Sequence, residues 1–501
     1  MGKRNKHKAV IKAADNVAKN DGPKPKIPFQ KSRELNELVA NLFNVASVIN
    51  TTSNVNREWE LFQEIEIILA SIVAIESEYF PSEKLERNEQ TLSELITWAQ
   101  DNGVQMESIG ISQFERYGYG VCATKDIAEG DPIVKVPRKL MITSDTIMES
   151  PLKSLYQNNQ IIRLMPNVAL ALYILYERFR SEDSFWRPYL NFLPPEYSTV
   201  LYFSSQDLLH MKGSPTFESA MKQCRNIFRQ YAHFKRLFQT GDDEVSKLFR
   251  AKFTYEEYRW AVSTVMTRLN AVPSETQDSE VHALIPIWDM CNHENGRLLT
   301  YYNPELHVSE CFSHRQFSSG QQVFIFYGVR RNADFLVHSG FFYPENDFDG
   351  VKILLGISKS DPYYDVRTQL LNRIRISSTR DFILTRTKDC GLEGALLAFL
   401  RVFNMTKEQL DSHLVRSEEE LQRLLNFPGR VDDYNETKTR EYLATRIKLL
   451  LSAYPTTVEN DTERLTDPSL SSYAVMSIHL CLSEKLILQN CMKFLEQLGR
   501  L

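Results

Sequence analysis

The sequence predicts an α+β protein in which a β domain with a helical insertion fills the middle of the chain and an all-α domain follows it. Three observations predict this class. Apolar residues first recur at helical spacing, the pattern then changes to short β-rich pieces punctuated by turn residues, and the last third returns to helical spacing. A chain of 501 residues is also longer than one hydrophobic core usually serves.

The chain begins with a lysine-rich stretch, residues 1–30, which we expect to be a disordered basic tail. A nuclear-import signal is the alternative interpretation of this stretch. Amphipathic helices are expected in residues 31–105, where Leu35, Leu38 and Leu42 begin an apolar stripe. The last of these helices is predicted to end at Asn102-Gly103, a typical helix C-cap.

A β-rich domain is predicted for residues 106–345. Its strands are expected at 109–114, 120–123 and 131–136, and again between 284 and 342. The intervening range, about 144–268, has helical spacing and is interpreted as an insertion. Residues 346–501 are helical in pattern throughout, which predicts a separate all-α domain.

Composition limits the function and the location of the protein. A net charge of -5 and a pI near 6.1 argue against a general nucleic-acid binder. The seven cysteines are scattered singly, so neither a zinc site nor a disulfide framework is expected, and a cytoplasmic location is the default. No apolar run approaches the roughly 20 residues that span a bilayer. Nothing in the pattern requires an oligomer, so we expect a monomer.

Three short motifs carry polar or glycine residues that suit a ligand site. Tyr117-Gly118-Tyr119-Gly120 lacks two Cβ atoms, which permits close approach of a ligand, although taken alone the motif is more typical of an ordinary β-turn or bulge. Asp289-Met290-Cys291-Asn292-His293 follows the apolar segment 284–288, which we interpret as a strand, and its alternative is a polar turn. Tyr327 ends the β-rich segment 323–328, where a buried core tyrosine is the alternative. No metal is expected, because His293 lacks further ligands at metal-binding spacing.

The order of these motifs resembles the signature of the SET-domain methyltransferases. The likeness extends through residues 184–189, 258–263, 268–270 and 330–341 to the group typified by plant Rubisco lysine methyltransferase, and within it to the members that methylate a histidine of actin. It covers roughly residues 80 to 500. It implies a SET fold for residues 106–345, with a pseudoknot between the Asn-His strand and the tyrosine segment, and a substrate-binding role for residues 346–501.

The resemblance also implies S-adenosyl-L-methionine (AdoMet) as the cofactor. The residues that it assigns to cofactor binding are Arg87, Tyr117, Gly118, Tyr119, Arg268, Asp289, Met290, Cys291, Asn292, His293, Ser339, Gly340 and Phe341. Those that resemble substrate-pocket residues are Trp288, Ile325 and Arg330. The chain departs from the family at Tyr117, where an acidic residue is usual, and at Leu269, where glutamine is usual.

Tyr327 and Asn270 are the expected catalytic residues. By resemblance Tyr327 lines the methyl-transfer channel, where its hydroxyl would orient the reactants. A lysine acceptor, with a pKa of about 10.4, must lose a proton first, whereas an imidazole with a pKa of about 6.5 is mostly neutral at pH 7. Asn270 suits a histidine acceptor because its oxygen can accept from one ring N–H, although a helix C-cap or a turn also explains this residue. The expected activity is histidine methylation of actin; the alternatives are a lysine methyltransferase and a catalytically silent SET scaffold that binds a partner.

Overall fold

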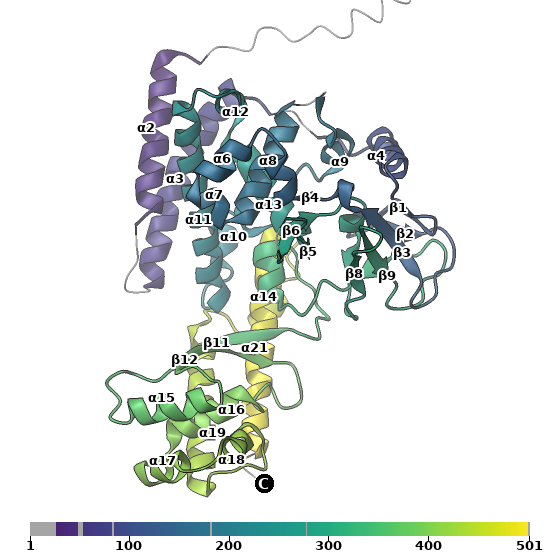
Figure 1. Cartoon of the computed structure of the whole chain (residues 1–501). Helices are drawn as coiled ribbons and strands as arrows, with labels where there is room; N and C mark the ends of the chain where they lie inside the picture. Colours follow the sequence, from purple (N-terminus) through teal and green to yellow (C-terminus); the bar gives the residue numbers. More distant parts are fainter. Residues whose placement is uncertain (1–26, 49–53, 83–84, 181–182, 277, 499–501) are drawn as a thin grey trace, which may run out of the picture.

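The computed structural model describes residues 27–48, 54–82, 85–180, 183–276 and 278–498. Figure 1 shows a large body of helices and short sheets above a smaller, mostly helical body, with helix α21 (Ser472–Leu498) extending from one into the other. Of the predicted basic tail, all but residues 27–30 lies outside the described ranges. Within those ranges no helix is both long and apolar enough to cross a membrane.

Three helices precede the first strand: α2 (Phe29–Ala46), α3 (Val55–Tyr79) and α4 (Glu89–Asp101). Helices α2 and α3 pack on each other and on α11 (Pro215–Thr240) along one flank of the large body (Figure 1). Helix α4 begins at a capping box formed by Asn88 and Thr91 and ends at Asn102. Gly103, with φ of +93°, turns the chain toward the sheets, as the sequence predicts for a C-cap glycine.

Short antiparallel sheets form the β region, and they are built from β1 (Ile109–Phe114), β2 (Gly118–Ala123), β3 (Pro132–Pro137), β4 (Ile142–Thr143), β5 (Asn270–Pro273), β6 (Glu280–Leu284), β8 (Thr300–Asn303) and β9 (Val308–Phe312). Strand β1 pairs with β2, the order β3-β9-β8 makes a second sheet, and β4-β6-β5 makes a third. The third sheet adjoins the helices of the insertion, because β6 contacts both α5 and α8.

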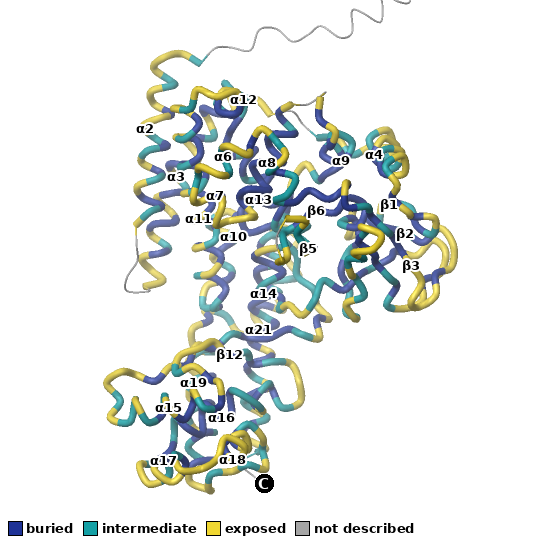
Figure 2. Tube along the Cα trace, viewed as in Figure 1, coloured by how far each residue is buried: buried dark blue, intermediate teal, exposed yellow. Residues whose placement is uncertain are grey.

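Helices occupy the range from 144 to 268, where the sequence predicts an insertion. They are α5 (Ser144–Met148), α6 (Lys153–Asn158), α7 (Gln160–Leu164), α8 (Pro166–Arg180), α9 (Arg187–Phe192), α10 (Ser205–Leu209), α11 (Pro215–Thr240), α12 (Glu244–Lys252) and α13 (Tyr255–Arg268). Helix α8 is buried on nearly all sides and packs against α13 in the middle of the large body (Figure 2). Helix α13 ends at Arg268 and β5 begins at Asn270, so the last residues of the insertion lie at the edge of the sheet.

The Asn-His segment and the tyrosine segment form the one parallel strand pair among the described residues. Strand β7 (Asn292–His293) pairs with β10 (Phe324–Ile325), with Asn292 opposite Phe324 and His293 opposite Ile325. On the side away from β7, the tyrosine segment bonds to β2, where the Val323 amide donates to the Val121 carbonyl at 2.8 Å. The tyrosine segment is therefore threaded between β2 and β7, as expected for the SET pseudoknot.

Two predicted strands are shorter than expected. The apolar segment 284–288 ends its pairing at Leu284, because Pro286 has no N–H to donate and Ile287 has φ of +68°. A short 3₁₀ turn, Trp288–Met290, follows. Within the segment 323–328 only Phe324 and Ile325 are paired, so Tyr327 lies just beyond the strand.

The last third is mainly helical and contains α15 (Tyr364–Arg373), α16 (Ala395–Asn404), α17 (Lys407–Leu414), α18 (Glu418–Gln422), α19 (Asp433–Ala453), α20 (Val458–Arg464) and α21. The α+β class is confirmed. The all-α description needs one correction, because an antiparallel hairpin of β11 (Gly350–Gly356) and β12 (Thr379–Thr385) opens this part. Val351, Ile353 and Leu355 alternate inward on β11 and are buried, which is the two-residue period of a strand.

Candidate active site

A small cavity of about 90 Å³ brings together the five residues predicted for catalysis and substrate binding. Its lining includes Asn270, Trp288, Ile325, Tyr327 and Arg330, which come from β5, the 3₁₀ turn after β6, β10 and the segment beyond it. Leu298 and Thr300 also line it, and neither was predicted from the sequence. Leu298 is a mostly exposed leucine, and no motif in the sequence marks either residue.

Tyr327 is held at this cavity by one backbone carbonyl and one imidazole side chain. Its hydroxyl donates to the Cys291 carbonyl at 2.6 Å, and its amide donates to Nδ1 of His293 at 3.2 Å. Burial raises the pKa of the Tyr327 hydroxyl well above its usual value. The hydroxyl therefore stays protonated at neutral pH and cannot act as a strong base.

Asn270 follows directly on the end of α13, whose C-cap is Leu269. Its side-chain nitrogen donates to the Arg268 carbonyl at 3.1 Å. This bond uses one of the two N–H donors and orients the amide, whose oxygen is its hydrogen-bond acceptor. The structure thus combines both interpretations of Asn270: it satisfies a helix-end carbonyl and it lines the cavity.

Arg268 and Asp289 form a buried ion pair beside the cavity. Arg268 Nη1 lies 2.8 Å from the Asp289 carbonyl and 3.2 Å from Asp289 Oδ1. Tyr189, on α9, donates its hydroxyl to Asp289 Oδ2 at 2.6 Å. Burial raises the pKa of Asp289, and Arg268 opposes that shift. The sequence analysis singled out the 184–189 segment but gave Tyr189 no place in the site.

Arg87 lies next to this pair. Its guanidinium sits 4.9 Å from the ring centre of Tyr119 and 4.7 Å from that of Phe192, and Nη2 contacts Met290 Sδ at 3.8 Å. Burial, together with the charge of Arg268, lowers the pKa of Arg87 to about 10. Predicted cofactor residues from three distant segments are therefore gathered here.

His293 is packed among aromatic rings at the pseudoknot. The ring centres of Phe335, Tyr327 and Phe341 lie 4.7, 5.1 and 6.2 Å from that of His293. Burial lowers the pKa of His293 to about 4, so the ring is neutral at physiological pH. Phe341 stacks on Phe335 at 4.7 Å, which brings the end of the 339–341 segment to the same cluster.

Several polar atoms in this region have no hydrogen-bond partner among the described residues. They are Nε of Arg87, Nε of Arg268, Nδ2 of Asn292 and Nε2 of His293, and all four are buried. Gly118, with φ of +66°, has open space where a Cβ would stand. Buried donors without partners are costly, so their convergence fits a site for a molecule that carries several acceptors.

Tyr117 is placed differently from the other predicted cofactor residues. Its ring is half exposed and lies edge-on against Phe324, 5.3 Å between centres. Its side chain therefore extends the aromatic surface of β10, where the family pattern has an acidic group.

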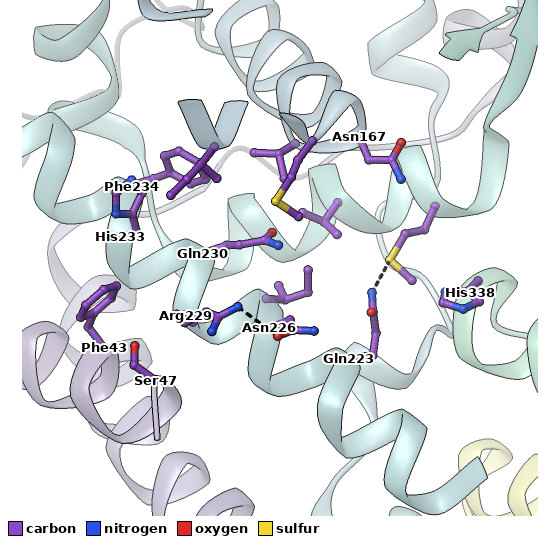
Figure 3. Close-up of a pocket in the computed structure, with 16 residues that line it drawn as sticks. Phe43, Ser47, Asn167, Gln223, Asn226, Arg229, Gln230, His233, Phe234 and His338 are labelled. Atoms are coloured by element: carbon purple, nitrogen blue, oxygen red, sulfur yellow. Dashed lines mark hydrogen bonds between the residues drawn. The ribbon is translucent and has the colours of Figure 1, made fainter. Parts of the chain in front are cut away.

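A second, larger cavity of about 610 Å³ lies among α2, α7, α8, α11 and α13 (Figure 3). Asn167, Gln223, Gln230 and His338 line it with polar groups, and Gln223 Nε2 contacts Met266 Sδ at 3.5 Å. Met266 lines both cavities, so the two are adjacent.

Comparisons with known proteins agree with this geometry. The SET-domain family model matches residues 118–328, and the model described as Rubisco LSMT substrate-binding matches residues 358–488. A solved structure of Rubisco LSMT bound to AdoMet has a TM-score of 0.66 and 23% sequence identity, over 81% of this chain and 92% of that chain. At that identity the likeness establishes the fold.

Fold and site together define a SET-domain methyltransferase with a C-terminal domain of the Rubisco LSMT substrate-binding type. The curated actin-histidine N-methyltransferase of Gallus gallus is 38% identical over 94% of this chain and 81% of its own length. The Mus musculus and Homo sapiens proteins of the same name are equally similar. The chain belongs to this actin-histidine N-methyltransferase family.

Proposed function

We propose that this protein transfers a methyl group from AdoMet to a ring nitrogen of a histidine in actin. The single observation that carries the histidine assignment is Asn270, whose NH₂ donates one bond to the Arg268 carbonyl and whose oxygen can accept from an imidazole N–H. The 38% identity to relatives named for this activity supports the same substrate.

The residues around Arg87, Arg268 and Asn292 fit AdoMet. AdoMet carries a carboxylate, ribose hydroxyls and adenine nitrogens, which are acceptors for the buried donors that lack partners. When bound, it supplies an electrophilic methyl group on a sulfonium. The open backbone at Gly118 allows close approach of such a ligand, and Arg87 with Tyr119 offers a flat surface beside it.

The chain's own residues then align the acceptor. Asn270 accepts from one ring nitrogen of the histidine, so the other nitrogen presents its lone pair along the cavity. The Tyr327 hydroxyl, already donating to the Cys291 carbonyl, turns its oxygen lone pairs into the cavity and orders the reacting groups electrostatically. No strong base is required, because an imidazole is mostly neutral at pH 7 with a pKa of about 6.5.

The larger cavity suits the polypeptide on one side of the acceptor. It adjoins the acceptor cavity at Met266 and has exposed Ile161, Leu164 and Met165 of the α7 region at or near its wall. Amide side chains in it can bond a peptide backbone, and the apolar wall can bury a side chain. We therefore propose that a segment of actin flanking the histidine lies there.

Peptide acceptors test the assignment. A peptide with the actin sequence around the methylated histidine should gain one methyl, and the same peptide with lysine in that place should gain none. Methylation of the lysine peptide alone would favour the lysine methyltransferase. Failure to bind AdoMet in calorimetry would favour the silent scaffold.

We also propose that the enzyme acts as a monomer in the cytoplasm, with a nuclear pool as the alternative. All seven cysteines are free in the structure, which suits a reducing compartment. Light scattering at working concentration tests the monomeric state, and cell fractionation tests the cytoplasmic location.

A further inference from the structure

Residues 328–341, which follow Tyr327, carry predicted site residues at both ends. Near the start of this segment Arg330 lines the acceptor cavity, and Ser339, Gly340 and Phe341 lie near its end. The first end is bonded to the C-terminal body, whereas the second end is also bonded to the helical insertion.

Asp349 fixes the first end. Its Oδ1 accepts from the Asn332 amide and its Oδ2 from Asn332 Nδ2, both at 2.9 Å. Asn332 in turn accepts from the Tyr343 amide at 3.1 Å, and Asn346 donates to the Arg330 carbonyl at 2.8 Å. Asn332, Asn346 and Asp349 are all at most 2% exposed. Buried networks of this kind hold a backbone in one arrangement when every member is satisfied.

The network continues into the C-terminal body. Ser483, in the buried part of α21, donates to Asp349 Oδ2 at 2.6 Å. Arg386, just after β12, donates to Ser483 Oγ at 2.7 Å and to the Pro344 carbonyl at 3.0 Å. Hydrogen bonds therefore connect the C-terminal body to the Arg330 backbone. They run through the side chains of Ser483, Asp349, Asn332 and Asn346.

The second end has its own contact with the helical insertion, although the next residue, Phe342, also stacks on His479 of α21 at 5.4 Å. Ser198, in the helical insertion, donates to the Gly340 carbonyl at 2.6 Å. A Cβ at Gly340 would stand 2.5 Å from the Ser198 carbonyl carbon, so the turn is pressed directly against that segment. Phe341 is further held by its stack on Phe335.

We propose that Asp349 and Ser483 are positioning residues for protein-substrate binding, through which the C-terminal substrate-binding body sets the place of Arg330 in the acceptor cavity. The statement rests on the proposed function for its kinetic readout. The C-terminal body would then help to position an active-site residue as well as provide a docking surface.

Kinetics of full-length Ser483→Ala test the proposal. Loss of one hydrogen bond to a buried carboxylate should raise KM for actin by about tenfold. The AdoMet dissociation constant and kcat should stay within about twofold, because the Ser198 contact remains. Asp349→Asn should shift KM further in the same direction. Ser477→Ala is the matched control, since Ser477 is buried on the same helix and its hydroxyl has no partner among the described residues.

Hydrogen exchange supplies a readout that does not depend on activity. Amides of residues 330–335 should exchange faster in Ser483→Ala than in Ser477→Ala, while residues 339–341 should be unchanged. Equal exchange in the two variants, or a parallel fall in AdoMet affinity and actin affinity, would overturn the proposal. A wild-type enzyme that leaves actin unmethylated would instead count against the proposed function, and the exchange result would still decide the inference.

Discussion

At the acceptor cavity the two side chains that we propose to be catalytic are fixed by neutral backbone carbonyls. Asn270 donates to Arg268 and Tyr327 donates to Cys291, at 3.1 and 2.6 Å. Both side chains are uncharged and bond to neutral groups. This suits a reaction that aligns a neutral nitrogen with a methyl group and needs little proton transfer.

Asn270→Ala removes the proposed acceptor for the imidazole N–H. We expect kcat/KM for a histidine peptide to fall by about 10- to 100-fold, the range for losing one oriented hydrogen bond in a buried site. AdoMet affinity by calorimetry should be little changed. An unchanged kcat/KM would show that Asn270 only bonds the Arg268 carbonyl at the end of α13.

Much of this site can be predicted from sequence, because its motifs are short and ordered along the chain. Asn270, Trp288, Ile325, Tyr327 and Arg330 do line one cavity. The Asn332–Asp349–Ser483 network could not be predicted, since its last link joins residues 134 positions apart and ordinary polar residues carry no signal of their partners. For Tyr117 the sequence shows the departure from the family pattern, but it does not show the contact of the ring with Phe324.

At the scale of elements, one buried ion pair holds α3 onto the insertion. Lys235 of α11 lies 2.7 Å from Glu76 of α3, and both are at most 3% exposed. Glu76 also accepts from the Tyr231 hydroxyl and the Tyr255 amide, each at 2.7 Å. The carboxylate is therefore fully engaged by groups from α11 and α13.

Lys235→Met leaves this carboxylate buried without its cation. We expect the free energy of unfolding to fall by about 3–5 kcal/mol, the usual cost of breaking a buried pair from one side. Urea titration measures the loss. The double variant Lys235→Met with Glu76→Gln should recover part of it, and a loss below 1 kcal/mol would contradict a structural role for the pair.

Helices were easier to predict than strands for a physical reason. The apolar stripes of α2, α3 and α8 extend over several turns, whereas β7 and β10 have two paired residues each. The β11–β12 hairpin was missed because exposed Leu354 lies between Ile353 and Leu355 and makes three apolar residues in a row, which hides the two-residue period of the strand. Pairing across the chain, which defines such strands, leaves no local pattern.

At the scale of the whole molecule, α21 joins the two bodies through buried polar residues. Glu484 accepts from Thr216 of α11 at 3.1 Å and from Tyr454, at the end of α19, at 2.8 Å. Burial, with a smaller contribution from nearby Asp349, raises the pKa of Glu484 to about 7. The junction therefore prefers a protonated carboxyl.

This preference predicts a pH dependence. Because the folded pKa lies above the ordinary value of 4.5, the contribution of Glu484 to stability is fully present below pH 4.5 and is lost as pH rises through 7. Glu484→Gln, which mimics the protonated form, should remove this loss. Its Tm relative to wild type should rise between pH 5 and pH 8, as measured by scanning calorimetry, whereas parallel Tm curves would contradict the assignment.

Methylation of intact actin tests the central claim most directly. Purified protein, AdoMet and unmethylated actin are incubated together, and any added methyl is located by tandem mass spectrometry, with Tyr327→Phe as the comparison. The proposed function predicts one methyl on a single actin histidine, with the rate greatly reduced in Tyr327→Phe. AdoMet binding without any methyl on histidine would contradict it and would direct attention to lysine acceptors.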